Sequence, residues 1–344
     1  MYSLKGLATG IGSLPHKDAK EAVRFVFKYV PDAPFWPQLP KRDIREGMIA
    51  QFSENIPCLK VNRDGLYFDA KDKEGQLESF YARVIDNDTE YFKISRDFAL
   101  GLHEFYDSLK KTGGKTLDFV KCQVTGPFTF SCGIKDDKGI ALLHDGVFKQ
   151  AILKGLAMKA LWQIKYFKEF TKKVILFFDE PYLGCFGSAY TPLNREEVVR
   201  DLTEFTAQIK SEDCLIGVHC CGNTDWSIFT DIEGIDIINF DAFGFMEKFL
   251  LYAGEIAKFL KRGGIICWGI VPTSDFTGDE SAAALVDKLK SAISTLEKKG
   301  TDSRLLSESL MISPACGLGT LEAEKAEKIF QLLNEASSFL RKNP

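Results

Sequence analysis

Short runs of apolar and β-branched residues recur along the chain, separated by longer segments in which apolar residues return every three or four positions. Short runs bounded by turn residues are typical of buried strands, and the longer spacing is typical of amphipathic helices. We expect strands over residues 8–13, 35–39, 119–124, 174–179, 215–219, 235–241, 265–270 and 310–313. We expect helices over residues 18–30, 43–54, 88–111, 145–172, 194–211, 247–261, 279–299 and 321–341.

This alternation of strand and helix predicts an α/β fold, a single (β/α)8 TIM barrel. One stretch, residues 57–85, departs from the pattern because alternating residues around Gly65–Asp69 are followed by turn-like residues. We interpret it as a β-hairpin insertion between strands 2 and 3, which either covers the mouth of the barrel or caps an edge. No repeat or linker divides the chain, so one domain over residues 1–344 is the simplest organisation.

Composition narrows the classes of function. The net charge is −4, the pI is near 5.8, and Lys and Arg are spread along the chain, which argues against a nucleic-acid or anionic-membrane binder. No apolar run is long enough to predict a membrane span, and residues 1–5 lack the features of a secretion signal. The nine cysteines lack the spacing of a disulfide framework and fit a reducing compartment. We expect a cytoplasmic protein.

Two segments far apart in sequence carry soft metal ligands. His219, Cys220 and Cys221 follow one apolar run, and Cys316 lies in a Gly-rich turn after another. His219 and Cys221 are two residues apart, so on a strand they point to one face and Cys220 points away. An imidazole with two thiolates suits zinc, which keeps a position open for substrate when the protein supplies three ligands. Asp241, after an adjacent strand, is the candidate fourth ligand; the alternative is a core histidine with buried thiols.

Other polar residues also follow predicted strands, where barrel enzymes place their chemistry. Ile11, Gly12 and Ser13 end the first strand, and their small size and hydroxyl suit backbone contact with a carboxylate, although such a turn alone is more often a plain loop. Asp179 and Glu180 follow an apolar run and would be costly to bury without partners. We expect one of them to bind a substrate ammonium group or hold a ligand; the alternative is a pair of surface or helix-capping carboxylates.

As a set, these segments resemble the C-terminal catalytic barrel of cobalamin-independent methionine synthase, in the superfamily that includes uroporphyrinogen decarboxylase and corrinoid-dependent methyltransferases. They occur in family order over most of the chain, at residues 11–15, 125–129, 179–181, 219–221, 236–241 and 313–318. Individually, only the His-x-Cys and Cys-Gly-Leu pair is specific.

The resemblance implies a ligand set and a substrate site. Zinc would be held by four residues, with Asp241 shorter than the Glu of the family: His219, Cys221, Asp241 and Cys316. The amino-acid substrate would be bound by the first turn and the Asp of Asp-Glu-Pro, which here are Ile11, Ser13 and Asp179.

The departures from the family lie on the methyl-donor side. The chain is too short for the additional N-terminal barrel of the folate-dependent enzymes. Residues 130–133 lack the tryptophan that helps to hold folate, and residues 271–275 replace the Asp-x-His segment implicated in proton delivery. The resemblance therefore implies that the zinc and thiol half of the site is retained and that the methyltetrahydrofolate half is lost or remade. The residues expected on the donor side are Thr125, Gly126, Ser274 and Asp275.

We therefore expect a zinc-dependent methyltransferase that acts on a small-molecule thiol. Homocysteine is the favoured acceptor because Ser13 and Asp179 would read its carboxylate and ammonium groups, and a methyl-corrinoid protein is the favoured donor. One alternative is a metal-free decarboxylase of the uroporphyrinogen type, which relies on arginines near the first strand; here Lys17 and Lys20 precede the first arginine, Arg24. The other is a non-catalytic protein that binds zinc or a corrinoid.

Overall fold

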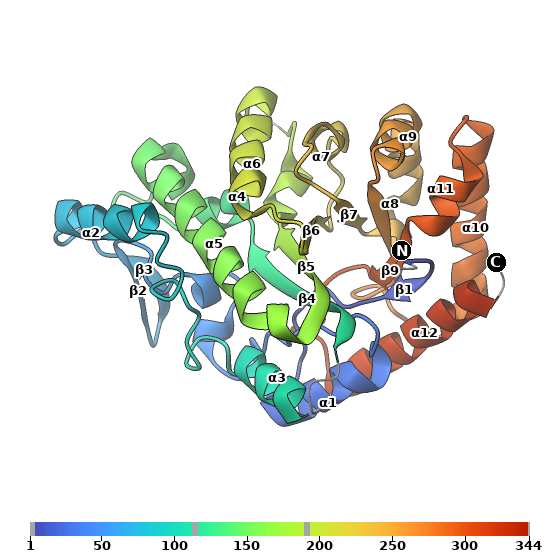
Figure 1. The fold of residues 1–344 in the computed structure, drawn as a ribbon, viewed down its shortest axis with the longest axis horizontal. Helices are drawn as coiled ribbons and strands as arrows, with labels where there is room; N and C mark the ends of the chain where they lie inside the picture. Colours follow the sequence, from blue (N-terminus) through green and yellow to red (C-terminus); the bar gives the residue numbers. More distant parts are fainter. Residues whose placement is uncertain (1–3, 112–115, 189–192, 343–344) are drawn as a thin grey trace.

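A curled, seven-stranded parallel sheet forms the centre of the computed structural model, which describes residues 4–111, 116–188 and 193–342 (Figure 1). The strand order is β1-β9-β8-β7-β6-β5-β4, and every neighbouring pair is parallel. The strands are β1 (Leu7–Ala8), β4 (Leu117–Thr125), β5 (Thr171–Asp179), β6 (Cys214–Cys220), β7 (Ile237–Phe240), β8 (Ile265–Val271) and β9 (Leu310–Pro314). The predicted α/β class is confirmed.

Helices cover the outer face of the curled sheet (Figure 1). The longer ones are α1 (Ala19–Tyr29), α2 (Lys73–Ile85), α3 (Leu100–Lys111), α5 (Gly146–Phe167), α6 (Arg195–Ile209), α8 (Ala242–Phe249), α9 (Ala253–Lys261), α10 (Ala282–Lys298) and α12 (Ala323–Lys342). The short ones are α4 (Pro127–Cys132), α7 (Ser227–Asp231) and α11 (Ser303–Glu308). Several helices begin where a side-chain oxygen accepts hydrogen bonds from the first turn, at Asp18, Asp145, Asn194, Ser281 and Asp302.

Side chains alternate between the two faces of each strand, which gives the molecule two apolar layers. The layer enclosed by the sheet contains Leu7, Ala33, Phe119, Ile175, Phe177, Ile237, Ile265, Cys267 and Met311. Their neighbours in sequence, such as Val120, Leu176 and Ile238, pack outward against the helices. Because both faces are buried, the strands read as continuous apolar runs in the sequence.

The predicted second strand, residues 35–39, does not form a regular strand. It makes isolated parallel bridges, Phe35 with Lys121 and Gln38 with Ser13. Proline recurs at Pro34, Pro37 and Pro40, and proline has no N–H to donate to a strand ladder. The first predicted strand is likewise regular only over Leu7–Ala8. A regular eight-stranded barrel is therefore not confirmed.

The predicted hairpin insertion is confirmed. Strands β2 (Leu59–Asn62) and β3 (Gly65–Phe68) pair antiparallel, and helix α2, which the pattern did not predict, follows them. The hairpin packs on the first turn of α5, where the Phe68 and Phe148 rings meet edge to face at 4.9 Å between centroids. In Figure 1 it lies beside α5, away from the centre of the sheet.

Two predicted helices differ from the structure. Residues 43–54 form only two short 3-10 turns, η1 (Ile44–Glu46) and η2 (Ala50–Phe52). The first turn ends at Gly47, whose backbone is extended, and the buried Glu46 before it accepts a hydrogen bond from Leu39 N and pairs with Arg42. The helix predicted over 88–111 begins at Leu100.

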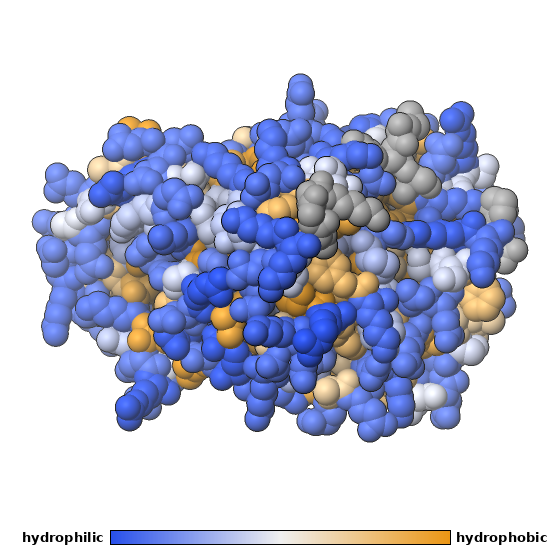
Figure 2. Space-filling view, turned by 60° about the horizontal axis from the view of Figure 1, so that its bottom comes forward, coloured by the Kyte–Doolittle hydropathy of each residue, from blue (hydrophilic) through white to orange (hydrophobic). Residues whose placement is uncertain are grey.

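The face shown in Figure 2 is mostly hydrophilic, with scattered hydrophobic residues. Within the described ranges, no helix has the length and apolar content needed to cross a membrane. The N-terminal segment, in which no secretion signal is predicted, lies partly outside the described residues.

Candidate metal and substrate site

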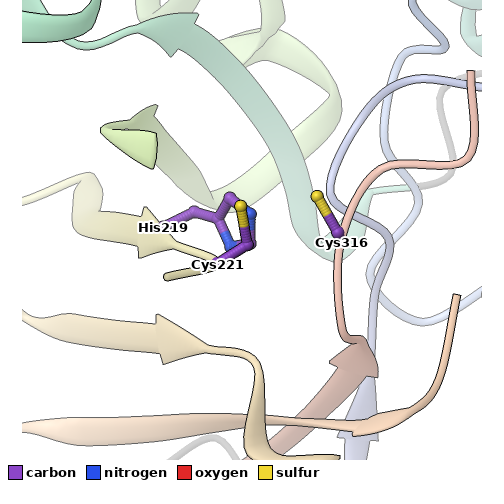
Figure 3. Close-up of side chains that lie close together, drawn as sticks. All are labelled: His219, Cys221 and Cys316. Carbon is purple, nitrogen blue, oxygen red and sulfur yellow. The ribbon is translucent and has the colours of Figure 1, made fainter. Parts of the chain in front are cut away.

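His219, Cys221 and Cys316 come together at the C-terminal edge of the sheet (Figure 3). His219 lies near the end of β6, Cys221 directly follows that strand, and Cys316 lies two residues beyond β9. One ligand atom from each side chain lies within 4.8 Å of the others. Cys220 points the other way and packs in the layer between sheet and helices. The structure thus groups the three soft ligands that the sequence singled out.

The site is organised by one register row of the sheet. Residues paired across parallel strands point to the same face. The row crosses all seven strands and runs through Thr125, Asp179, His219, Asn239, Cys267, Met311 and Leu7. Two candidate site residues, Asp179 and His219, are therefore direct neighbours on the inner face.

The imidazole of His219 is buried and bonded on one side only. Its Nδ1 lies 2.5 Å from Asn239 Oδ1, whereas its Nε2 is buried without a hydrogen-bond partner. A buried polar atom without a partner costs about 1–3 kcal/mol, so such an atom calls for an explanation. An imidazole nitrogen left open beside two cysteine sulfurs matches the donor set that zinc prefers. The residues present therefore fit a zinc ion.

The two thiols influence each other strongly. The adjacent Cys221 thiol lowers the pKa of the Cys316 thiol well below its usual value, burial opposes this shift, and the nearby His219 supports it. The adjacent Cys316, together with burial, raises the pKa of Cys221. Burial lowers the pKa of His219, but the neighbouring Cys316 and Asp179 outweigh burial and raise it overall. The pair thus favours one thiolate, which is the form that binds metals.

Asp241, the predicted fourth ligand, directly follows β7 and is half-buried. Its Oδ1 accepts a hydrogen bond from Gly244 N at 2.8 Å, so the carboxylate caps helix α8. Burial raises the pKa of Asp241, and Cys316 raises it further, which places the carboxylate within electrostatic reach of that thiol. It does not belong to the close group of three, and its role as a ligand stays a prediction.

The two acidic residues at the end of β5, Asp179 and Glu180, have different surroundings. Glu180 is fully buried and accepts hydrogen bonds from Phe128 N at 2.9 Å and from Thr129 N and Oγ1 at 2.8 and 2.7 Å. Asp179 is buried too, but its Oδ1 has no partner. Burial raises the pKa of Asp179, while His219 and Lys121 oppose that shift. Asp179 therefore has an acceptor free for a ligand, and Glu180 is occupied by the start of α4.

The predicted Ile11-Gly12-Ser13 turn lies against the loop that carries Cys316. Ser13 Oγ accepts a hydrogen bond from Gly319 N at 3.2 Å, and Ser13 O accepts one from Leu318 N at 3.0 Å. Gly12 has a φ of +156°, a conformation that side chains disfavour, and an added Cβ would lie 2.5 Å from Gln38 Oε1. The turn and one metal-ligand segment are thus joined directly.

The four predicted donor-side residues lie in two places. Thr125 donates from its Oγ1 to the Met48 carbonyl at 2.6 Å. Gly126 packs so closely that an added Cβ would lie 2.3 Å from Glu180 Oε1. Ser274 and Asp275 are exposed on the loop after β8, where the Ser274 carbonyl accepts a hydrogen bond from Lys325 Nζ at 3.3 Å. Their role toward a donor stays a prediction.

Lys121 is a site residue that the sequence pattern did not single out. It is fully buried on the inner face of β4, where its Nζ donates to the Ile11 carbonyl and, at 3.1 Å, to Gln123 Oε1. Burial lowers the pKa of Lys121 to about 8, although the nearby Asp179 raises it. The available signal was a lysine within a mostly apolar run, residues 119–124, two positions before Gln123.

Comparison with known proteins finds a shared fold and no closer relationship. No protein-family model matches the chain, and no curated protein matches it. A B12-independent methionine synthase from Shewanella sp. W3-18-1, solved in complex with selenomethionine, aligns with a TM-score of 0.60 at 16% identity, over 99% of this chain and 98% of its own. A methyltransferase from Methanosarcina mazei aligns with a TM-score of 0.53 at 11% identity, over 96% and 94%. The resemblance to methionine synthases is therefore confirmed at the level of the fold.

Replacing Lys121 by Met is expected to change how stability depends on pH. Because burial lowers the folded-state pKa to about 8 from 10.5, the unfolded chain binds more protons between these values and wild-type stability rises with pH across that window. Over that range, the free energy of unfolding of the wild type should rise by roughly 1–3 kcal/mol relative to that of the variant. Urea unfolding at each pH is the measurement. The exposed Lys258→Met substitution controls for the loss of one lysine. A constant difference between wild type and Lys121→Met would contradict the assignment.

Proposed function

We propose that this protein is a zinc-dependent methyltransferase that transfers a methyl group to a thiol, with homocysteine as the acceptor. The observation that carries the proposal is the buried, unpartnered Nε2 of His219 beside the sulfurs of Cys221 and Cys316. The shared fold supports it, because one structure with that fold is a methionine synthase bound to selenomethionine, an analogue of a methylated homocysteine.

His219, Cys221 and Cys316 would hold the metal, with Asp241 as the candidate fourth ligand. Zinc, when bound, lowers the pKa of a coordinated thiol so that the thiolate forms at neutral pH. The chain's own contribution is to present one nitrogen and two sulfurs at one edge of the sheet, where His219 is buried and both cysteines are half-buried. The interaction between the two thiols favours the thiolate of Cys316 and disfavours that of Cys221, so the second sulfur would lose its proton when the metal binds.

Asp179 and Ser13 would orient the amino-acid part of the substrate. The open Oδ1 of Asp179 suits an ammonium group, and a bound cation would favour the ionised carboxylate that burial disfavours. Ser13 lies beside the loop of Cys316, so a carboxylate held there would be close to the metal-ligand segment. Lys121 Nζ donates a hydrogen bond to the Ile11 carbonyl and so stabilises this turn.

For the methyl donor we propose a methyl-corrinoid protein. Residues 130–133 and 271–275 lack the folate-contacting tryptophan and the Asp-x-His segment of the family that the chain resembles. Thr125, Gly126, Ser274 and Asp275 would face the donor.

We propose further that residues 1–344 form one (β/α)8 domain that works in the cytoplasm. Residues 35–38 bridge both β4 and the segment after β1, so they would take the place of the eighth strand. All nine cysteines are free, as a reducing compartment would keep them.

Zinc content tests the ligand set. The purified protein is expected to carry about one zinc per chain, because His219, Cys221 and Cys316 match a catalytic site with three protein ligands. Cys221→Ser should remove most of the zinc, measured by elemental analysis after dialysis against a weak chelator. Cys220→Ala is the matched control and should retain it, since Cys220 packs away from the site. A metal-free wild type, or equal zinc in Cys221→Ser, would refute this ligand set.

Ligand binding tests the role of Asp179. Asp179→Asn should weaken homocysteine binding by about 10–100-fold, because a hydrogen bond to a charged group contributes about 1.5–3 kcal/mol. Isothermal titration is the measurement. The matched ligand is 4-mercaptobutyrate, which has the thiol and carboxylate of homocysteine but no ammonium group, and its affinity should not change. An equal loss for both ligands would mean that Asp179 does not read the ammonium group.

Turnover identifies the donor. With homocysteine as acceptor, we expect methionine to form from a methylated corrinoid protein and not from methyltetrahydrofolate, and methylcobalamin serves as the protein-free corrinoid control. Mass spectrometry of methionine is the measurement. Turnover with methyltetrahydrofolate alone would contradict the donor assignment while leaving the thiol chemistry intact; failure with all three donors would contradict the methyltransferase itself.

A further inference from the structure

Asn239 lies at the centre of the register row that organises the site. It is fully buried on β7 and is paired with His219 on β6 and with Cys267 on β8. Its amide group contacts three strands besides its own: Oδ1 lies 2.5 Å from His219 Nδ1, and Nδ2 lies 2.8 Å from both the Cys267 carbonyl and Ser313 Oγ. Ser313 belongs to β9, the strand that leads to Cys316.

The orientation of this amide is fixed by what its neighbours are able to accept. The Cys267 carbonyl has no proton to give, so the group facing it must be the amide nitrogen. Ser313 Oγ donates its only proton to the Pro314 carbonyl at 2.8 Å, so it too must accept from Asn239. Both protons of Nδ2 are thereby used, and the amide oxygen is the atom that faces His219.

The amide oxygen in turn fixes the proton on the imidazole. Oδ1 has no proton, so His219 Nδ1 must carry one and donate it. In the neutral ring the lone pair is then on Nε2, which is the atom that is buried without a partner beside the cysteines. A histidine that binds a metal through one nitrogen commonly donates the other to such a partner, which holds the ring in place.

We propose that Asn239 is the positioning residue of the metal site, holding His219 in the Nδ1–H form with Nε2 directed at Cys221 and Cys316. This inference rests on the proposed function, since it concerns the same ligand set. It goes further by connecting the two ligand-bearing strands, because one side chain bonds His219 on β6 and Ser313 on β9.

Metal affinity is the first test. Asn239→Leu removes the acceptor at similar volume and should weaken zinc binding by about 10–100-fold in a chelator competition, the usual effect of losing such a partner. Asn334→Leu is the matched control: its amide bonds the Tyr29 carbonyl, outside the metal site, so the loss should stay below about threefold. An affinity for Asn239→Leu equal to that of wild type would overturn the inference, whereas absence of zinc binding by wild type would overturn the proposed function.

The second test needs no metal. The chain has only four histidines, so nitrogen-detected NMR of the metal-free protein can resolve the ring of His219. We expect an Nδ1–H proton protected from exchange with water, since that hydrogen bond forms without a metal. Its loss in Asn239→Leu would support the inference. The absence of a protected Nδ1–H in wild type would overturn it, even if the Leu variant failed to fold.

Discussion

The whole site depends on the register of the parallel strands. Asp179, His219, Asn239 and Cys267 are paired in a single row, and because neighbours in a row share a face, they all point inward. A slip of one residue on β6 would turn His219 toward the helices and bring Cys220 inward. The register is held by packing one layer below, where Gly217 leaves room for the Phe177 ring; a Cβ there would lie 2.3 Å from that ring. The packing of Phe177 against Gly217 thus determines which residues at the end of β6 face the site.

Most of the buried polar side chains on the inner face of the sheet have hydrogen-bond partners within the protein. Lys121 is bonded to Ile11 O and Gln123, and Asn239 uses every hydrogen-bonding group of its amide. Two buried atoms in the register row of the site lack hydrogen-bond partners: Asp179 Oδ1 and His219 Nε2. Leaving such atoms buried costs stability, and ligands that bond them recover that cost. A ligand that bonds these two atoms, which lie on adjacent strands, would therefore gain the most binding free energy.

The sequence predicted those parts of the molecule whose signals are local. Strands β5, β6, β8 and β9 were found within a few residues because both of their faces are buried, which leaves uninterrupted apolar runs. His219, Cys221 and Cys316 were found because residue type and position after a strand suffice. Residues 35–39 were predicted wrongly as a strand, because their apolar character was given more weight than prolines that remove N–H donors.

What the sequence missed depends on contacts between distant residues. Nothing near Asn239 in sequence indicates that its amide would face His219, 20 residues away, and Ser313, 74 residues away. The different surroundings of Asp179 and Glu180 likewise arise from α4, whose first turn occupies only Glu180.

Zinc K-edge X-ray absorption with and without homocysteine tests the central claim most directly. We predict a shell of nitrogen and sulfur that gains one sulfur when homocysteine is added; a zinc-free protein, or a shell that homocysteine leaves unchanged, would contradict it.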